Sequence, residues 1–270
     1  MPPLVSILVP TYNRAATLRQ TLDSIFSQSL QDFEIILVDD ASTDSTPSLL
    51  ASYSDPRLHV YRNETNLGQA GNAARCLSLA TAPYVHYLYS DDYFLPDCLS
   101  RKIAAITQSP DIALVFAATQ IIAPDGHPIA TRRPFRSDRL LDGARLARHA
   151  FRFKNIYGEP SNVLFRRDLA MRLGGFAPEL SYTVDWEFWL RLSCQARVAY
   201  LATPLSAFRI SASSVTGALR WSSFRADDDA FVRRVRSNSR LPISPIDILL
   251  HRLTQPPRML LRTLWLRHHL

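Results

Sequence analysis

Five short apolar runs, separated by helical patterns, organise the first 118 residues. They predict buried strands at Leu4–Val9, Phe33–Val38, Leu58–Tyr61, Tyr84–Leu88 and Ile112–Ala118. Between them, apolar residues recur at helical spacing, as at Leu18, Leu22 and Ile25. Strands that alternate with helices form βαβ units, so the pattern predicts an α/β fold with a mostly parallel central sheet flanked by helices.

The pattern changes after residue 120. A segment rich in Pro and Arg predicts a loop or hairpin over 121–140, and later patterns predict further elements: helix 141–153, strand 163–165, helix Val184–Cys194, strand 198–201 and helix 219–237. We therefore expect three parts, a nucleotide-binding half at 1–118, a half at 119–215 that completes the site, and a helical basic extension at 216–270.

Two pairs of acids directly follow predicted strands. Asp39 and Asp40 end the second apolar run, and Asp91 and Asp92 follow the fourth. The carboxyl ends of parallel strands meet at one sheet edge, where ligands bind in open α/β sheets. Adjacent carboxylates repel each other unless a cation joins them, so this edge predicts a divalent metal, Mn²⁺ or Mg²⁺, that carries a phosphate ligand. A solvated acidic turn is the alternative for Asp91 and Asp92.

Several single residues suit a nucleotide ligand. Asp40 can accept a hydrogen bond from a uracil-type base, and Tyr12 offers a flat ring for stacking. Helix capping is the alternative for Asp40, and packing within its loop is the alternative for Tyr12. Arg75 adds positive charge near a diphosphate, or it simply faces solvent from its helix.

Asp185 is a candidate general base. It begins a helix lined by Trp186 and Trp189, and partial burial there raises a carboxyl pKa. The helix N-terminus favours the carboxylate and acts in the opposite direction. The sequence leaves the sign of the shift open, and an aspartate that only stabilises the helix dipole is the alternative.

Charge and composition limit the class of protein. The net charge is +7, and residues 221–270 contain nine arginines and four aspartates. Nucleic acid, an anionic membrane surface or a diphosphate ligand could each explain this excess. The chain has no run of 18 apolar residues, its N-terminal segment lacks a basic start followed by a long apolar stretch, and its three cysteines lack metal-ligand spacing. We therefore expect a cytoplasmic protein.

Four segments together carry a resemblance to a known family. They are Val5–Arg14 (VSILVPTYNR), Phe33–Asp44 (FEIILVDDASTD), Ser90–Asp92 and Asp185–Leu192 (DWEFWLRL), and with Asn66-Leu67-Gly68 they occur in the expected order over residues 4–195. This pattern resembles family 2 glycosyltransferases, which have the GT-A fold. The segments Asn66–Arg75 and Gly158–Arg167 look like a bacterial branch that builds surface polysaccharides.

The resemblance implies transfer of a hexose from a nucleotide-diphospho-sugar, expected to be UDP-linked, to a glycan or lipid-linked acceptor with inversion. It assigns nucleotide-sugar binding to one set of positions: Pro10, Tyr12, Asp40, Asn72, Arg75 and Asp91. It assigns the metal to Asp92 and the general base to Asp185. The Gln-x-x-Arg-Trp element of processive synthases is absent, so we expect single additions.

Two positions depart from the family pattern. Many members have an acid two residues before Asp91, where this chain has Tyr89, and many have Glu before the base, where this chain has Val184. The first departure leaves Asp92 as the main predicted metal ligand, and it keeps open a binding module of the same fold without turnover.

Other enzymes with similar sheets fit less well. A nucleotidyltransferase would share the acidic edge but should carry a glycine-rich basic loop after the first strand, and Pro10–Arg14 contains no glycine. A dinucleotide-dependent dehydrogenase is excluded because no Gly-x-Gly-x-x-Gly follows that strand.

The C-terminal tail is a separate question. Arg258, Arg262 and Arg267 alternate with apolar residues, which suggests an amphipathic helix in peripheral contact with an anionic membrane on its cytoplasmic face. A helix that packs on the domain or pairs a subunit is the alternative. We do not expect nucleic acid binding, because this tail contains a single aromatic residue, and the sequence does not specify an oligomeric state.

Overall fold

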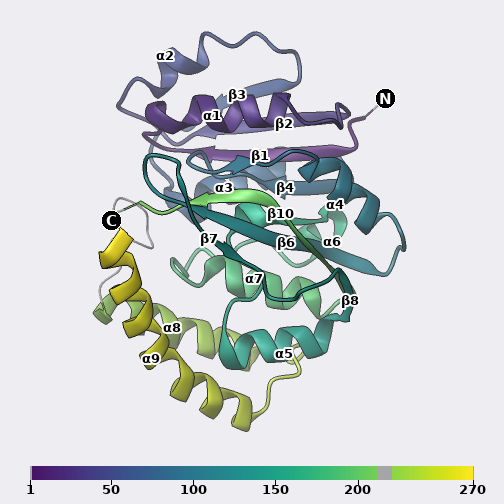
Figure 1. Ribbon diagram of the computed structural model, residues 1–270, viewed down its shortest axis with the longest axis vertical. Coiled ribbons are helices and arrows are strands. Elements are labelled where there is room, and N and C mark those ends of the chain that lie inside the picture. The colour runs from purple at the N-terminus through teal and green to yellow at the C-terminus, as the bar shows by residue number, and fades with distance from the viewer. Residues whose placement is uncertain (1, 212–220, 270) are drawn as a thin grey trace.

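A mixed sheet forms the centre of the molecule (Figure 1). The computed structural model describes residues 2–211 and 221–269, and these contain ten strands in one sheet. The strands are β1 (Val5–Thr11), β2 (Phe33–Asp39), β3 (Leu58–Arg62), β4 (Tyr84–Tyr87), β5 (Tyr93–Phe94), β6 (Ile112–Ile122), β7 (Pro128–Arg132), β8 (Arg139–Asp142), β9 (Val163–Arg166) and β10 (Arg197–Arg209). Their main order is β3-β2-β1-β4-β9-β6-β10-β5, so the predicted α/β class is confirmed.

Parallel pairing joins the strands of the first part of the chain and also joins β6 to β10. Strands β3, β2, β1 and β4 are all parallel, as predicted. Beyond β4, strand β9 pairs antiparallel with both β4 and β6, which makes the whole sheet mixed. The short run at 163–165 did not reveal this, because pairing direction depends on how the chain returns to the sheet.

Helices cover both faces of the sheet. They are α1 (Ala15–Phe26), α2 (Thr46–Leu50), α3 (Gly68–Leu79), α4 (Cys98–Ile106), α5 (Gly143–Phe153), α6 (Arg167–Arg172), α7 (Val184–Ser193), α8 (Trp221–Ser237) and α9 (Pro245–His269), with a 3₁₀ turn at Pro160–Asn162. One apolar core contains residues of α1 and α4, and a second contains residues of α3, α5, α7 and α8. Strands β1 and β2 contribute to both cores, so they are buried on both faces and have continuous apolar sequences.

Helix α7 is more deeply buried than its sequence suggests. Every residue from Trp186 to Ser193 is buried, including Glu187 and Arg191. These two form an ion pair of 2.7 Å, and Arg234 of α8 approaches Glu187 at 2.8 Å. The predicted half-buried helix therefore has a polar side that faces α8 instead of solvent. Because this helix carries Asp185 at its start, its fixed position also fixes that carboxylate.

The C-terminal extension packs against the second half of the chain (Figure 1). The fully buried Asp247 of α9 accepts hydrogen bonds from Arg148 and Arg152 of α5. His251 Nε2 of α9 lies 2.7 Å from Asp228 Oδ1 of α8. Helix α9 therefore belongs to the folded body. None of the helices that the structure describes is long and apolar enough to cross a bilayer.

Candidate active site

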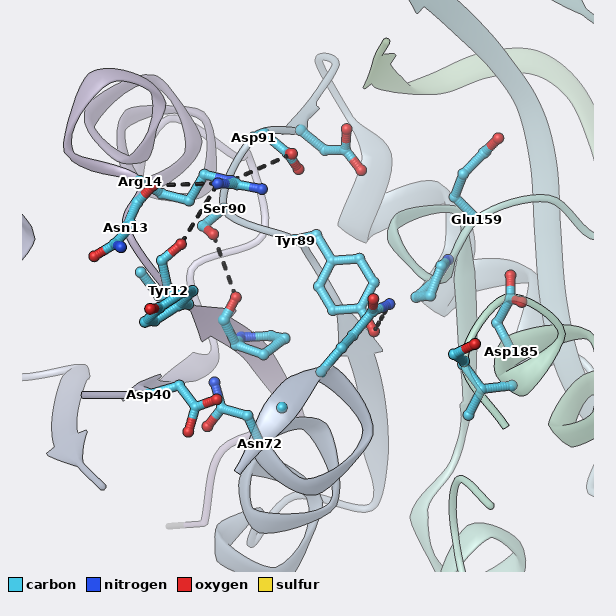
Figure 2. A pocket seen from close by; sticks show the side chains of 18 of the residues that line it. Tyr12, Asn13, Arg14, Asp40, Asn72, Tyr89, Ser90, Asp91, Glu159 and Asp185 are labelled. Carbon is cyan, nitrogen blue, oxygen red and sulfur yellow. Dashed lines mark hydrogen bonds and ion pairs between the residues drawn. The ribbon is translucent and has the colours of Figure 1, made fainter. Parts of the chain in front are cut away.

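A cavity of about 570 Å³ lies at the carboxyl ends of β1, β2 and β4. Seven of the eight predicted site residues line it: Pro10, Tyr12, Asp40, Asn72, Asp91, Asp92 and Asp185. Figure 2 shows that the labelled side chains lie on two facing walls. Asp40 and Asn72 lie on one wall, and Asp185 lies on the other together with Glu159.

The loop after β1 presents an aromatic ring at the cavity. Tyr12 is 43% exposed, so its ring is available to a ligand. The following residue, Asn13, has φ of 50°, a left-handed conformation that asparagine tolerates better than most residues. Its side-chain oxygen accepts hydrogen bonds from the backbone N–H groups of Thr43 and Asp44. These contacts join the loops after β1 and β2 and hold Tyr12 at the cavity.

Asp40 is buried at the end of β2 but retains one free oxygen. Its Oδ1 accepts hydrogen bonds from Asn63 Nδ2 at 2.5 Å and from the backbone N–H of Leu67 at 2.8 Å. Among the described residues, no donor contacts Asp40 Oδ2. This oxygen can accept a hydrogen bond from a ligand, which is the role that the sequence analysis expects of Asp40. The helix-capping alternative applies instead to Asp44, which accepts from the backbone N–H of Thr46.

A polar network behind Asp40 contains the remaining predicted residues of this wall. Asn72 Nδ2 donates to the carbonyl of Val38 at 2.9 Å, and its Oδ1 accepts from Asn63. Arg75 donates to Asn63 Oδ1 and does not line the cavity. The structure therefore places Arg75 behind Asn63, where it can orient the amide that contacts Asp40. Asn63 itself was missed by sequence analysis because a lone asparagine after a short strand carries no pattern.

The acidic loop after β4 is held from several directions. The hydroxyl of Thr17 in α1 donates to the carbonyl of Ser90, and that of Thr21 donates to the carbonyl of Asp92 at 2.7 Å. From the far end of the chain, the Arg209 side chain donates to the carbonyl of Asp91. These contacts fix the loop backbone, so the directions of both carboxylates are fixed as well.

The two acids of this loop lie in different surroundings. Asp92 is 1% exposed, its Oδ1 accepts from the backbone N–H of Arg209 at 2.9 Å, and its Oδ2 accepts from the hydroxyl of Ser161. The Asp91 side chain is 19% exposed and lies 3.5 Å from the guanidinium of Arg14 (Figure 2). Burial raises the pKa of both carboxyls, and the neighbouring Asp91 raises that of Asp92 further.

The carboxylate of Asp91 is better placed to coordinate a divalent cation than that of Asp92. Both Asp92 oxygens already accept hydrogen bonds from the protein, whereas Asp91 presents its carboxylate to the cavity. In the part of the chain that the structure describes, no three His, Cys, Asp or Glu side chains cluster as a metal site. A cation held by one or two carboxylates and by substrate phosphates needs no such cluster.

Asp185 lies across the cavity at the start of α7. Its Oδ1 accepts from the backbone N–H of Trp186 at 2.8 Å, and its Oδ2 lies 3.3 Å from Asn155 Nδ2. Burial raises the pKa of Asp185 to about 7, and the charge of Glu159 acts in the same direction. The direction of the pKa shift of Asp185, which the sequence left open, is therefore upward. A carboxyl group with a pKa near neutrality is suited to accept a proton.

Sequence analysis did not assign roles to three charged residues that shape this site. Arg14 faces Asp91, and Arg209 donates to the Asp91 carbonyl, to two other backbone carbonyls and to Gln20. Glu159 accepts two hydrogen bonds from Arg132 and raises the pKa of Asp185. Arg14 and Glu159 lie within the motifs described above, which was a usable signal. Arg209 had none, because it is 118 residues from Asp91 in sequence.

Solved structures share this arrangement of sheet and helices. The mannosyltransferase PcManGT of Pyrobaculum calidifontis, in complex with GDP-Man and Mn²⁺, superposes with a TM-score of 0.67 at 19% identity, over 98% of this chain and 74% of that chain. TarS of S. aureus (residues 1–349), in complex with UDP-GlcNAc, gives a TM-score of 0.72 at 18% identity, over 96% of this chain and 72% of that chain. The fold is that of GT-A transferases.

The sequence comparison identifies the family within that class. The model of the family described as "Glycosyl transferase family 2" matches residues 6–174. The chain therefore belongs to glycosyl transferase family 2. TuaG of Bacillus subtilis, whose name refers to teichuronic acid biosynthesis, is 36% identical over 129 residues, which is 47% of this chain and 51% of that protein. Across four curated relatives, the matches cover 51 to 69% of the relatives' own lengths.

Proposed function

We propose that this protein is an inverting, non-processive hexosyltransferase that moves a sugar from a UDP-linked donor to a glycan or lipid-linked acceptor. One observation carries the proposal. A carboxylate with a pKa near 7, Asp185, faces across one cavity the acidic loop and the buried Asp40. A nucleotide-binding wall opposite a base is what sugar transfer to a hydroxyl requires. Family membership and the Mn²⁺-bound mannosyltransferase of the same fold support this reading.

In this proposal the donor nucleoside binds the wall formed by residues 1–118. The Tyr12 ring stacks on the base, Asp40 Oδ2 accepts the base N–H, and the Pro10 segment and Asn72 border the ribose. Arg75 acts indirectly by orienting Asn63. Arg14 contributes positive charge beside Asp91, where the diphosphate would lie.

We assign the metal-binding carboxylate to Asp91, with Asp92 as the residue that anchors the loop. This exchanges the roles that the family resemblance gave to the two acids. We make the exchange because the backbone N–H of Arg209 and the hydroxyl of Ser161 already donate to the two oxygens of Asp92. When a divalent cation is bound, it supplies charge neutralisation for the diphosphate that leaves. Tyr89 precedes the two acids and accepts a hydrogen bond from Gln69, and burial raises the pKa of its phenol, so it adds no negative charge there.

Asp185 would remove the proton of the acceptor hydroxyl as the new glycosidic bond forms. The base and the diphosphate site lie on opposite walls of the cavity, so attack occurs on the face of the sugar away from the leaving group. That geometry inverts the anomeric carbon. Asn155 and the backbone N–H of Trp186 hold the carboxylate in position.

Donor binding and turnover are tested together with purified protein. A panel of UDP- and GDP-sugars is measured by thermal shift with Mn²⁺ and with EDTA, and the best donor is then assayed for metal-dependent release of the nucleoside diphosphate. We expect Asp185→Asn to keep donor affinity within about twofold and to lower turnover by about 10² to 10⁴-fold, the usual contribution of a general base. Turnover near that of the unaltered protein would refute the base assignment.

A binding module without turnover is the second candidate, and Tyr89 favours it because an acid of the family pattern is missing there. The same assay separates the two functions. Tight binding of a nucleotide-sugar with no release of nucleoside diphosphate, with or without Mn²⁺, would support the module and contradict the transferase.

We also propose that the outer face of α9 touches an anionic membrane on its cytoplasmic side. Large apolar residues recur there at helical spacing and are each more than half exposed: Ile246 (65%), Leu249 (58%), Leu253 (63%), Leu260 (62%), Leu261 (66%) and Leu264 (53%). The arginine excess of residues 221–270 supplies charge complementary to anionic lipid.

Vesicle flotation tests this contact. We expect the double variant Leu253→Ser/Leu260→Ser to lose binding to vesicles that contain phosphatidylglycerol, with donor binding unchanged. Leu140→Ser on β8 removes an apolar side chain that is 40% exposed and serves as the control. Equal flotation of all three proteins would exclude this face as the membrane contact.

A further inference from the structure

A second cavity of about 480 Å³ lies on the other side of Asp185. It is bordered by residues of β6, α7, β10 and α9 and by the segment before the 3₁₀ turn. Asp185, Glu159, Tyr182 and Phe208 line both cavities. The proposed base therefore lies at the junction of the two cavities, with the acidic loop on one side and α9 on the other.

The second cavity carries an excess of positive charge. Four cationic side chains line it, Arg132, Lys154, Arg258 and Arg262, against the two acids Glu159 and Asp185. Arg132 is already paired with Glu159. A neutral sugar would need no further cations here, so the excess indicates an anionic ligand.

Arg258 makes this point most directly. It is half-buried and, among the described residues, forms no ion pair with an acid. Burial lowers its pKa, which shows that the charge has lost hydration without gaining a carboxylate partner. Arg262 lies one turn further along α9, with its guanidinium 5.1 Å from the ring of Tyr182. The two arginines lie four residues apart and can contact one phosphate together.

Much of the remaining lining is apolar, beside the polar groups of Asn155, Tyr182 and Gln255. The apolar members are Ile121, Trp186, Phe208, Ile210, Met259, Leu261 and Trp265. Leu261 also belongs to the exposed apolar face of α9 and is 66% exposed. The apolar lining is thus continuous with the outer surface of that helix, and an aliphatic chain could run from the cavity to that surface.

We propose that this second cavity is the acceptor site and that it takes a phosphate ester of an aliphatic alcohol whose attached glycan presents the hydroxyl to Asp185. The inference rests on the proposed function for the identity of the base. The acceptor oxygen forms a bond to the anomeric carbon while the bond from that carbon to the donor diphosphate breaks. The hydroxyl proton passes to Asp185, and the nucleoside diphosphate leaves with the electron pair.

Three probes separate the chemical features of such an acceptor. Decyl phosphate carries the phosphate and the chain, glucose 1-phosphate carries a phosphate on a sugar without the chain, and decyl β-glucoside carries the chain on a sugar without a phosphate. Binding is followed by calorimetry in the presence of UDP, with Trp186 and Trp265 as fluorescence reporters in the cavity wall. We expect decyl phosphate to bind about tenfold more tightly than either other probe. Equal binding of glucose 1-phosphate would overturn the proposal.

Arginine variants test whether Arg258 and Arg262 bind the phosphate group. We expect Arg258→Gln/Arg262→Gln to weaken decyl phosphate binding about tenfold or more, since charge-assisted contacts to phosphate are lost. The control Arg233→Gln/Arg236→Gln removes the same charge from α8 without altering either cavity. The single variant Arg258→Gln breaks no ion pair of the described residues, so it serves if the double variant unfolds. Unchanged decyl phosphate affinity in Arg258→Gln and the double variant would refute the site.

The same samples are also measured for UDP-sugar binding and for release of nucleoside diphosphate. These readouts belong to the other cavity and to Asp185. If they are normal while decyl phosphate binding fails, the acceptor inference is wrong and the proposed transferase remains. If they fail in the unaltered protein, the proposed function is wrong.

Discussion

The two walls of the main cavity are built in different ways. The wall with Asp40 consists of loops that follow neighbouring parallel strands. Hydrogen bonds such as Asn63 to Asp40 and Thr21 to the Asp92 carbonyl hold these loops, together with the ion pair of Arg14 and Asp91. The wall with Asp185 is assembled from segments far apart in the chain and contains the charged pair Arg132–Glu159.

This difference relates to what each wall has to recognise. Strand order alone brings the first set of loops together, so a nucleotide site forms wherever this sheet forms. The second wall depends on how α7, β10 and α9 pack, and small changes there alter shape and charge without disturbing the sheet. We therefore expect substitutions to change the wall with Asp185 more readily than the wall with Asp40. Five measurements test whether the two walls act independently.

The largest expected effect separates the two acids of the donor wall. Asp91→Asn should weaken Mn²⁺-dependent donor binding by about two orders of magnitude, because metal coordination contributes several kcal/mol. Asp92→Asn should weaken it far less, because each Asp92 oxygen already accepts a hydrogen bond from the protein. Both variants are titrated with the nucleotide-sugar donor, once in Mn²⁺ and once in EDTA, to measure the metal-dependent affinity. If Asp92→Asn loses more Mn²⁺-dependent donor affinity than Asp91→Asn, the metal ligand is Asp92.

The next effect concerns nucleoside recognition. Asp40→Ala should weaken UDP binding by about 2 kcal/mol, since a buried carboxylate acceptor is lost and the amide of Asn63 is left without it. Calorimetry with UDP is the measurement, and decyl phosphate binding should stay unchanged because Asp40 lines only the first cavity. If Asp40→Ala weakens the binding of both UDP and decyl phosphate, the two walls are not independent.

The third effect is the pH dependence of turnover. Asp185 must be a carboxylate to accept a proton, and its pKa is raised to about 7 by burial. Turnover should therefore fall about tenfold per pH unit below 7 and become level above it. Donor binding over the same range is the control. A rate that stays constant down to pH 5 would exclude Asp185 as the base.

The same shift has a consequence for stability, with a definite sign. A raised folded-state pKa means that Asp185 favours folding when protonated and opposes it when ionised. This contribution is lost as pH rises from the unfolded value through about 7. Asp185→Asn should accordingly keep or raise the melting temperature at pH 8, which makes it a sound variant for the turnover assay.

The smallest expected effect concerns loop positioning. Thr21→Val removes one hydroxyl that donates to the Asp92 carbonyl, and it should lower the free energy of unfolding by about 1 kcal/mol. Donor affinity should fall only severalfold, as the loop keeps its contacts to Thr17 and Arg209. Urea unfolding and donor titration measure both. Complete loss of donor binding would show that α1 alone holds the loop.

The donor wall was predictable because its signals are local. Strand ends at Asp40 and Asp91, the loop with Tyr12, and the helix that carries Asn72 are each visible in a few consecutive residues. Arg75 was predicted to bind the nucleotide-sugar, and the structure places it behind Asn63, which residue spacing on a helix does not show. The family resemblance gave the metal to Asp92 and the nucleotide side to Asp91, and these roles stay predictions, because adjacent residues share a motif but not their contacts.

The α/β class, the family, the acidic sheet edge and the positions of its aspartates can be read from the chain alone, because strand periodicity and strand-end residues depend on neighbours in sequence. The insertion of β9, the upward pKa shift of Asp185 and the position of Arg258 and Arg262 at a second cavity required the folded structure. Each of these depends on contacts between segments far apart in sequence, because packing determines how deeply a group is buried and burial shifts its pKa.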